Sequence, residues 1–317
     1  MIKKGVRRPF ESWSEPHLRL KQPNSRRRSM TICIAAFAAE SKAIVCIADR
    51  AVTYASTTGG PSSQADEGIQ KIVELGRTGW IALIADDVPF AQKVTDEMNS
   101  NIGSERSPTA QQMMRWARTA YEKYQEEEIV ARVLTPNLLT RDDFLRRPAA
   151  LQPLDTKYVL EIARLIQEVD VNCTLLICGF DAQGPHIIKV RNGGGVDPCD
   201  IEGYGVIGGG EDTSRGRIIW SETDRSDELE SVMYDVFDAK VSAEIIQGVG
   251  YVWDWRILLP GKRARKVPKR ISELIDKLWI TNNRSPFAES LSVRQKPPKN
   301  WKRRLEEFSS RVIGERP

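Results

Sequence analysis

The chain has 317 residues, of which 40% are hydrophobic, and a formal net charge of +4. This composition can bury a large core in one or two domains, and it excludes a disordered chain. No run approaches the roughly 18 to 20 apolar residues that span a bilayer, and the first 30 residues contain no apolar signal-peptide stretch. We therefore expect a globular cytoplasmic protein with no membrane partner.

Cysteine and histidine usage narrows the chemistry further. The five cysteines are odd in number and three of them lie in strand-like apolar runs, which predicts reduced core thiols. The two histidines are His17 and His186. Serine triads, cysteine dyads and most zinc sites use imidazole, so a histidine-based hydrolase is not expected. No metal-ligand spacing or dinucleotide-binding glycine motif is present, and the sequence predicts no metal and no cofactor.

The first predicted element is a hairpin that follows a polar beginning. Residues 1–30 mix Pro, Ser, Lys and Arg without periodicity. They indicate a disordered basic leader, or a start assigned at Met1 in place of Met30. The runs TICIAAFA and AIVCIAD then flank the polar AESK, which is typical of a β-hairpin in a buried sheet. Thr31 opens this hairpin and Asp49 closes it.

The next stretch combines a loop, a second strand pair and helices. Residues 52–68 are rich in Ser, Thr, Gly and Asp, which predicts a loop. KIVEL and WIALIAD then form a strand pair that begins at Lys71, and helices are predicted over 89–99 and 108–133. Prolines break residues 134–153 before the amphipathic YVLEIARLIQEV. We expect a helical insertion over about 134–170.

The last part of the chain returns to strands. A hairpin is predicted from CTLLICGFD and PHIIKV, and a short strand that ends in glycines from GYGVIGGG. A helix is predicted over residues 226–245, and a closing strand follows in YVWDWRILL. The order of strands, helices, strands, helices and strand suits an α+β fold with two stacked antiparallel sheets flanked by helices. We place this domain at 31–260.

Residues 261–317 begin with the basic run GKRARKVPKR and contain several prolines. They indicate a basic, partly helical C-terminal appendage outside the core. The basic run has no interleaved aromatic residue, so a nucleic-acid partner is not expected.

Five segments in order resemble the proteasome β-subunit family, and the match is closest to bacterial and archaeal β-like proteins. They are MTICIAAFAAESKAIVCIADRAVTYA, KIVELG, WIALIADD, CTLLICGFDAQGPHIIKV and GYGVIGGGED, and together they cover about 230 residues. The resemblance implies the four-layer αββα sandwich of N-terminal-nucleophile hydrolases.

The same resemblance implies a catalytic set. Thr31 matches the threonine that attacks through its hydroxyl while its own α-amine acts as base. A free α-amine has a pKa of about 7.7 to 8.0, so it accepts a proton near neutral pH without a histidine. Asp49 matches the family aspartate that ends the second strand, and Lys71 matches the lysine that opens the third.

Three departures bear on activity. Thr31 is internal in the chain, so its nitrogen is an amide and becomes a free α-amine only when residues 1–30 are absent. Ala85 lies where the family presents a glycine near the oxyanion, and Gly209 lies where it has a serine. Glu244 and Gln247 replace a late aspartate and serine. Ala85, Gly209 and Glu244 are therefore expected at the rim of the site.

The sequence thus predicts a threonine-type amide hydrolase, a proteasome-like peptidase acting on peptides or unfolded proteins. The resemblance also implies a homo-oligomeric ring or stack and an ATP-dependent unfoldase as partner. The alternative is a catalytically inactive subunit with a role in assembly or regulation. Exposure of Thr31 as the N-terminus distinguishes the two.

Overall fold

The computed structural model describes residues 31–54, 63–65, 70–142, 144, 156–171, 173–246, 249–282 and 300–314. The expected leader and Gln247 lie outside these residues. The chain divides into two compact units. Of the described residues, 129–168 belong to one unit and the rest to the other.

The first sheet is built around the predicted N-terminal hairpin. Its strands are β1 (Ile32–Ala38), β2 (Ala43–Asp49), β10 (Tyr204–Gly208), β11 (Trp253–Leu258) and β12 (Arg265–Lys266), in the order β10-β1-β2-β11-β12, and all are antiparallel to their neighbours. Every residue of β1 and β2 is buried. Both faces of the hairpin are covered, which explains its two continuous apolar runs.

The second sheet is also antiparallel. Its strands are β5 (Ile72–Leu75), β6 (Trp80–Asp86), β7 (Cys173–Asp181), β8 (Gly184–Val190) and β9 (Val196–Pro198), in that order across the sheet. The predicted hairpins within it are confirmed. A separate ribbon of β3 (Val52–Tyr54) and β4 (Ser63–Ala65) lies within the expected loop 52–68.

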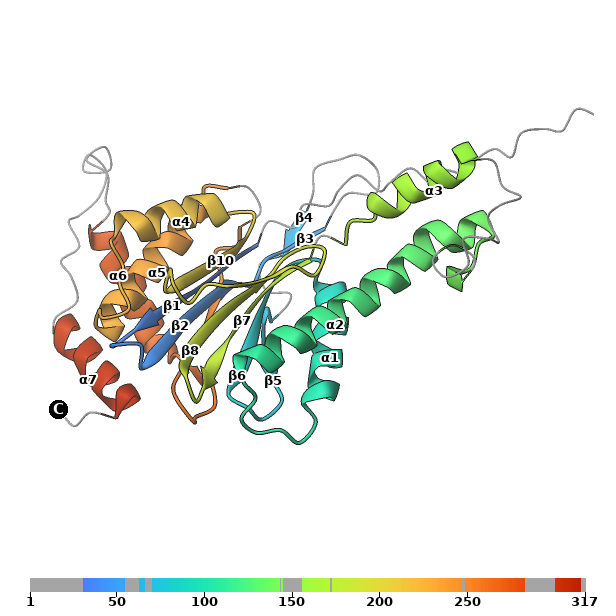
Figure 1. The fold of residues 1–317 in the computed structure, drawn as a ribbon. Helices are drawn as coiled ribbons and strands as arrows, with labels where there is room; N and C mark the ends of the chain where they lie inside the picture. The colour runs from blue at the N-terminus through green and yellow to red at the C-terminus, as the bar shows by residue number, and fades with distance from the viewer. Residues whose placement is uncertain are drawn as a thin grey trace, which may run out of the picture. The chain divides into compact units, whose positions relative to one another are not determined.

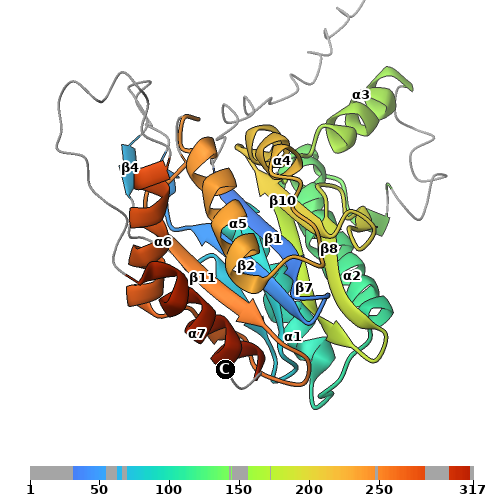
Figure 2. The same cartoon turned by 90° about the vertical axis from the view of Figure 1, so that its left-hand side faces the viewer.

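The helices of the larger unit cover the outer faces of the two sheets (Figures 1 and 2). They are α1 (Val88–Ile102), α2 (Ala110–Ile129), α4 (Glu211–Trp220), α5 (Leu229–Ala243), α6 (Lys269–Asn282) and α7 (Trp301–Ile313). One apolar core packs α4 to α7 on the first sheet, a second packs α1 and α2 on the second sheet, and a third fills the space between the sheets. The fold is α+β with two antiparallel sheets and helices on both sides, as predicted.

The smaller unit contains the region expected as an insertion. A π-helical turn (η1, Val130–Leu134) and a 3-10 turn (η2, Thr135–Asn137) precede α3 (Thr156–Gln167). The Tyr158 hydroxyl donates to the Asn137 carbonyl at 3.2 Å, which ties α3 to η2. Across the part of the chain that the structure describes, no helix combines the length and apolar character needed to cross a bilayer.

The structure differs from the sequence prediction at the C-terminus. Residues after 260 were expected outside the core, but β12 pairs with β11, and α6 and α7 belong to the core of the first sheet. The buried face of α6 consists of Ile271, Leu274, Ile275 and Leu278. This spacing is that of an amphipathic helix, whereas its basic residues remain on the exposed side. The many basic residues of this region led to the prediction of an appendage, although its apolar residues have helical spacing.

Candidate functional site

Four segments of the larger unit end at one place, which we call the Thr31 end. The β1–β2 hairpin brings Thr31 and Asp49 to the same end, because Cys33 pairs with Ala48 across it. On the other side of β1, Ile32 pairs with Gly208 at the end of β10. Antiparallel pairing alone therefore places these three termini side by side.

Lys71 joins this end from the other sheet. It immediately precedes β5, and its Nζ lies 2.7 Å from Thr31 Oγ1 and 2.9 Å from Asp49 Oδ1. The side chains of Lys71 and Asp49 have no exposed surface, and Thr31 is also fully buried. The structure thus brings together the three residues that the sequence predicted as catalytic. A lysine that donates to a hydroxyl oxygen also stabilises negative charge that develops there.

Asp49 is held by backbone donors as well. Its Oδ1 accepts from the Ile32 N–H at 3.2 Å, and its Oδ2 accepts from the Gly250 N–H at 2.9 Å. A buried charge pair is stable when its remaining lone pairs are satisfied in this way. The neighbouring Cys33 thiol has its pKa raised well above the ordinary value, mainly by burial and next by the charge of Asp49. Cys33 is therefore neutral at this end.

Gly208 lies close to the backbone of Thr31. Its φ is +105°, and a Cβ at this position would lie 2.0 Å from the Thr31 carbonyl oxygen. A side chain is therefore excluded here for both conformational and steric reasons. Gly209, which was predicted at the rim, lies between β10 and α4. Within the glycine cluster, Gly208 is thus close to Thr31.

Ala85 does not present its N–H to Thr31. It is buried in the interior of β6, opposite Thr174 of β7. Ile84 donates its N–H to the Lys71 carbonyl at 2.9 Å, and N–H groups alternate between the two edges of a strand. The Ala85 N–H therefore points to β7, whereas that of Asp86 points to the Lys71 edge. This orientation does not support Ala85 as an oxyanion donor, and its place at the rim of the site stays a prediction.

Asp86 was missed by the sequence analysis. It ends β6 with a left-handed φ of +72°, directly before Asp87, whose side chain caps α1 by accepting from the Phe90 N–H. Burial raises the pKa of Asp86 to about 6, with opposing contributions from Thr174 and Lys71. Two adjacent aspartates before Pro89 are typical of a helix start. This pattern explains Asp87 as the cap, and it gives no separate signal for Asp86.

Glu244 lies just after α5 and forms an ion pair with Lys240. The Lys240 side chain is fully buried, and its Nζ lies 4.4 Å from the centre of the Trp253 ring. Burial lowers the pKa of Lys240 and raises that of Glu244. The predicted rim residue therefore pairs with a lysine that the sequence analysis missed. Lys240 follows Val236 by four residues and Phe237 by three, so it falls on the apolar face of the helix. A lysine on that face is an unusual buried charge, and this spacing could have identified it.

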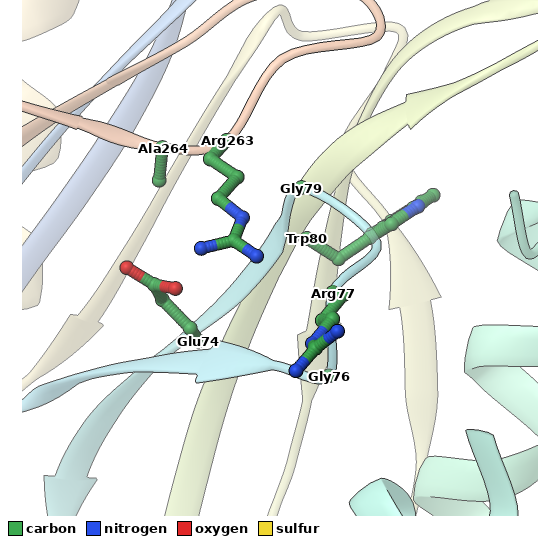
Figure 3. Close-up of a pocket in the computed structure, with 7 residues that line it drawn as sticks. All are labelled: Glu74, Gly76, Arg77, Gly79, Trp80, Arg263 and Ala264. Atoms are coloured by element: carbon green, nitrogen blue, oxygen red, sulfur yellow. The ribbon is translucent and has the colours of Figure 1, made fainter. Parts of the chain in front are cut away.

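A hollow at the opposite end of β5 and β6 contains none of the residues of the Thr31 end. Figure 3 shows Arg263 extending into the space between Glu74 and Trp80. At this end a Cβ on Gly79 would lie 2.6 Å from the Lys262 carbonyl oxygen. The chemistry suggested by Thr31 therefore does not depend on this hollow.

Comparison with protein-family models gives no match, and no curated protein matches the chain. Within the described ranges, no group of three or more His, Cys, Asp or Glu side chains is placed to bind a metal ion. The assignment of function therefore depends on the geometry of the Thr31 end.

Proposed function

We propose that this protein is a threonine-type amide hydrolase of the N-terminal-nucleophile class, with Thr31 as nucleophile. The observation that carries the proposal is the contact of Lys71 Nζ with both Thr31 Oγ1 and Asp49 Oδ1, at 2.7 and 2.9 Å. A cation held beside a threonine hydroxyl in a buried site stabilises negative charge on that oxygen, which is what a threonine nucleophile requires. Peptides and unfolded protein segments are the proposed substrates.

The proposed reaction requires Thr31 at the N-terminus. Its hydroxyl oxygen attacks the substrate carbonyl carbon, and the hydroxyl proton moves to the free α-amine. The amine then gives this proton to the departing nitrogen, which leaves an ester between Thr31 and the acyl group. Water, deprotonated by the same amine, cleaves the ester and restores the hydroxyl. Lys71 donates a hydrogen bond to the oxygen of Thr31 and stabilises the negative charge that develops on it.

Asp49 has a positioning role in this scheme. It accepts from Lys71 and from the backbone N–H groups of Ile32 and Gly250, so three segments hold its carboxylate. The carboxylate balances the charge of Lys71 and fixes the direction of its ammonium group. The scheme needs no histidine, in agreement with the composition of the chain.

The alternative function is a catalytically inactive subunit. One observation favours it for the full chain: Thr31 follows 30 residues and is fully buried, so its nitrogen is an amide and its hydroxyl has no solvent exposure. An amide nitrogen cannot act as a base near pH 7. The two functions therefore differ in whether removal of residues 1–30 produces activity.

Peptide hydrolysis by a protein beginning at Thr31 tests the proposal. Such a protein arises by translation from Met30 and removal of the methionine, which the small threonine side chain permits. We expect it to hydrolyse fluorogenic peptides that the full chain leaves intact. A protein with Thr31→Ser should keep measurable activity because it keeps a hydroxyl, whereas Thr31→Ala should have none. Equal behaviour of the Thr31→Ala and unmodified proteins would favour the inactive subunit.

A further inference from the structure

Asp86 is a carboxylate without an ion-pair partner in the described part of the chain, and it lies at the same end as the proposed nucleophile. Asp86 is two residues beyond Ile84, whose N–H reaches the carbonyl of Lys71. The two sheets approach closely here, because Cys33 Sγ lies 3.3 Å from the Ile84 carbonyl oxygen. Cys33 is two residues after Thr31, so Asp86 and Thr31 extend from this contact toward the same end.

The described residues around Asp86 do not compensate its charge. Its hydrogen-bond donor is the Thr174 hydroxyl, at a long 3.4 Å. Of the ion pairs among the described residues, none involves Asp86. The charged groups that face it are Lys71, whose ammonium is engaged by Asp49, and the carboxylates of Asp170 and Glu211. Glu211 is itself paired with Lys189.

An uncompensated, partly buried carboxylate is unfavourable in the free protein, and a bound cation removes that cost. Asp86 keeps some solvent exposure, so a ligand can reach it. We propose, on the basis of the proposed function above, that Asp86 selects substrates with a positively charged side chain, lysine or arginine, next to the scissile amide. The guanidinium of arginine would bind this carboxylate through two hydrogen bonds.

The proposal predicts a pH-dependent preference. Burial raises the pKa of Asp86 to about 6, so its carboxyl is protonated at pH 5 and ionised at pH 7.5. The same shift makes the free protein less stable relative to the unfolded chain as pH rises from about 4 to about 6, because the unfolded aspartate ionises first. The preference for a cationic side chain should therefore increase as pH rises through about 6.

Matched peptides test the proposal on the protein beginning at Thr31. One peptide carries arginine before the scissile amide, and the other carries citrulline, which has nearly the same shape without the charge. We expect kcat/KM for arginine to exceed that for citrulline by at least about tenfold at pH 7.5. Asp86→Asn should reduce this ratio to near one. Asp87→Asn is the matched control, because asparagine also caps a helix and Asp87 faces α1; it should keep the ratio.

The outcomes separate this inference from the proposed function. Equal hydrolysis of both peptides by the unmodified protein would overturn the inference and leave the hydrolase proposal intact. A uniform loss with both peptides in Asp86→Asn would also overturn it, since Asp86 would then act on Thr31 itself. Absence of hydrolysis with every peptide would overturn the proposed function, and the inference with it.

Discussion

A buried and a half-buried charge cluster occupy opposite ends of the second sheet, and their partners differ. At the Thr31 end, Lys71 bridges the Asp49 carboxylate and a threonine hydroxyl. At the other end, which we call the His186 end, the His186 nitrogens lie 2.7 Å from Asp200 and 2.9 Å from Asp181. Lys71 therefore contacts a potential nucleophile as well as a carboxylate, whereas His186 contacts two carboxylates.

The difference shows what a buried charge signifies in this fold. His186 stacks on Trp80 with ring centres 6.1 Å apart, and Asp181 also accepts from the Ala110 N–H at the start of α2. This cluster joins a hairpin to a helix, and both imidazole nitrogens are engaged. Lys71 also joins two sheets, but one of its hydrogen bonds goes to the Thr31 hydroxyl, which could act as a nucleophile. Hydrogen bonds and opposite charges offset the cost of burial in both clusters. Only the cluster at the Thr31 end includes a hydroxyl that could act as a nucleophile.

The largest expected effect is that of Lys71→Met in the protein beginning at Thr31. Hydrolysis should fall by about a hundredfold to a thousandfold or more, because the hydroxyl oxygen loses its charged donor. The free energy of unfolding should fall by about 3–5 kcal/mol, since Asp49 is left buried without a counter-charge. Peptide assays and urea unfolding measure the two effects.

The double variant Lys71→Met with Asp49→Asn is the control for this change. Removing both charges should restore part of the stability and none of the activity. Recovery of activity together with stability would mean that Lys71 has a purely structural role, like His186.

A smaller effect is expected for Gly208→Ala. Its Cβ would lie 2.0 Å from the Thr31 carbonyl oxygen, and the φ of +105° is unfavourable for alanine. We expect a loss of about 3 kcal/mol in unfolding free energy. Gly216→Ala, within α4 where a Cβ has open space, is the matched control and should stabilise by about 0.5–1 kcal/mol. Similar unfolding curves for both variants would contradict the close approach of β10 to Thr31.

The smallest effect is expected at the His186 end, for His186→Gln. The carboxylate of Asp200, and then that of Asp181, raise the pKa of His186 above its ordinary value of 6.5, against the effect of burial. The protonated side chain therefore stabilises the fold fully below pH 6.5, and this contribution is lost as pH rises through the folded pKa. The stability difference between the two proteins should be larger at pH 6 than at pH 9 by urea unfolding. Peptide hydrolysis should be unchanged. A loss of hydrolysis would mean that the two ends are coupled.

The sequence was sufficient to predict the two sheets, where signals were local, and the resemblance supplied the three residues that meet at the Thr31 end. Alternation of apolar runs and the polar AESK marked the Thr31 to Asp49 hairpin, and antiparallel pairing does bring its ends together. Lys71 was predicted from the resemblance, because nothing local distinguishes it from a surface lysine.

Other features were beyond sequence reasoning for physical reasons. Helix α4 buries only Ser214 and Ile218 along its length, so it has no apolar stripe to detect. The Gly250 N–H that holds Asp49 lies 201 residues later in the chain, and such a contact depends on the whole fold. The orientation of the Asp86 N–H depends on the register of β6, which the sequence does not specify.

Covalent labelling of Thr31 tests the central claim most directly. The protein beginning at Thr31 is treated with a β-lactone, an electrophile that acylates activated hydroxyls, and its intact mass and the modified peptide are measured. We predict one adduct per chain on Thr31, and a strongly reduced rate of labelling in Lys71→Met. An unlabelled Thr31, or equal labelling rates with and without Lys71, would contradict the assignment of Thr31 as a nucleophile activated by Lys71.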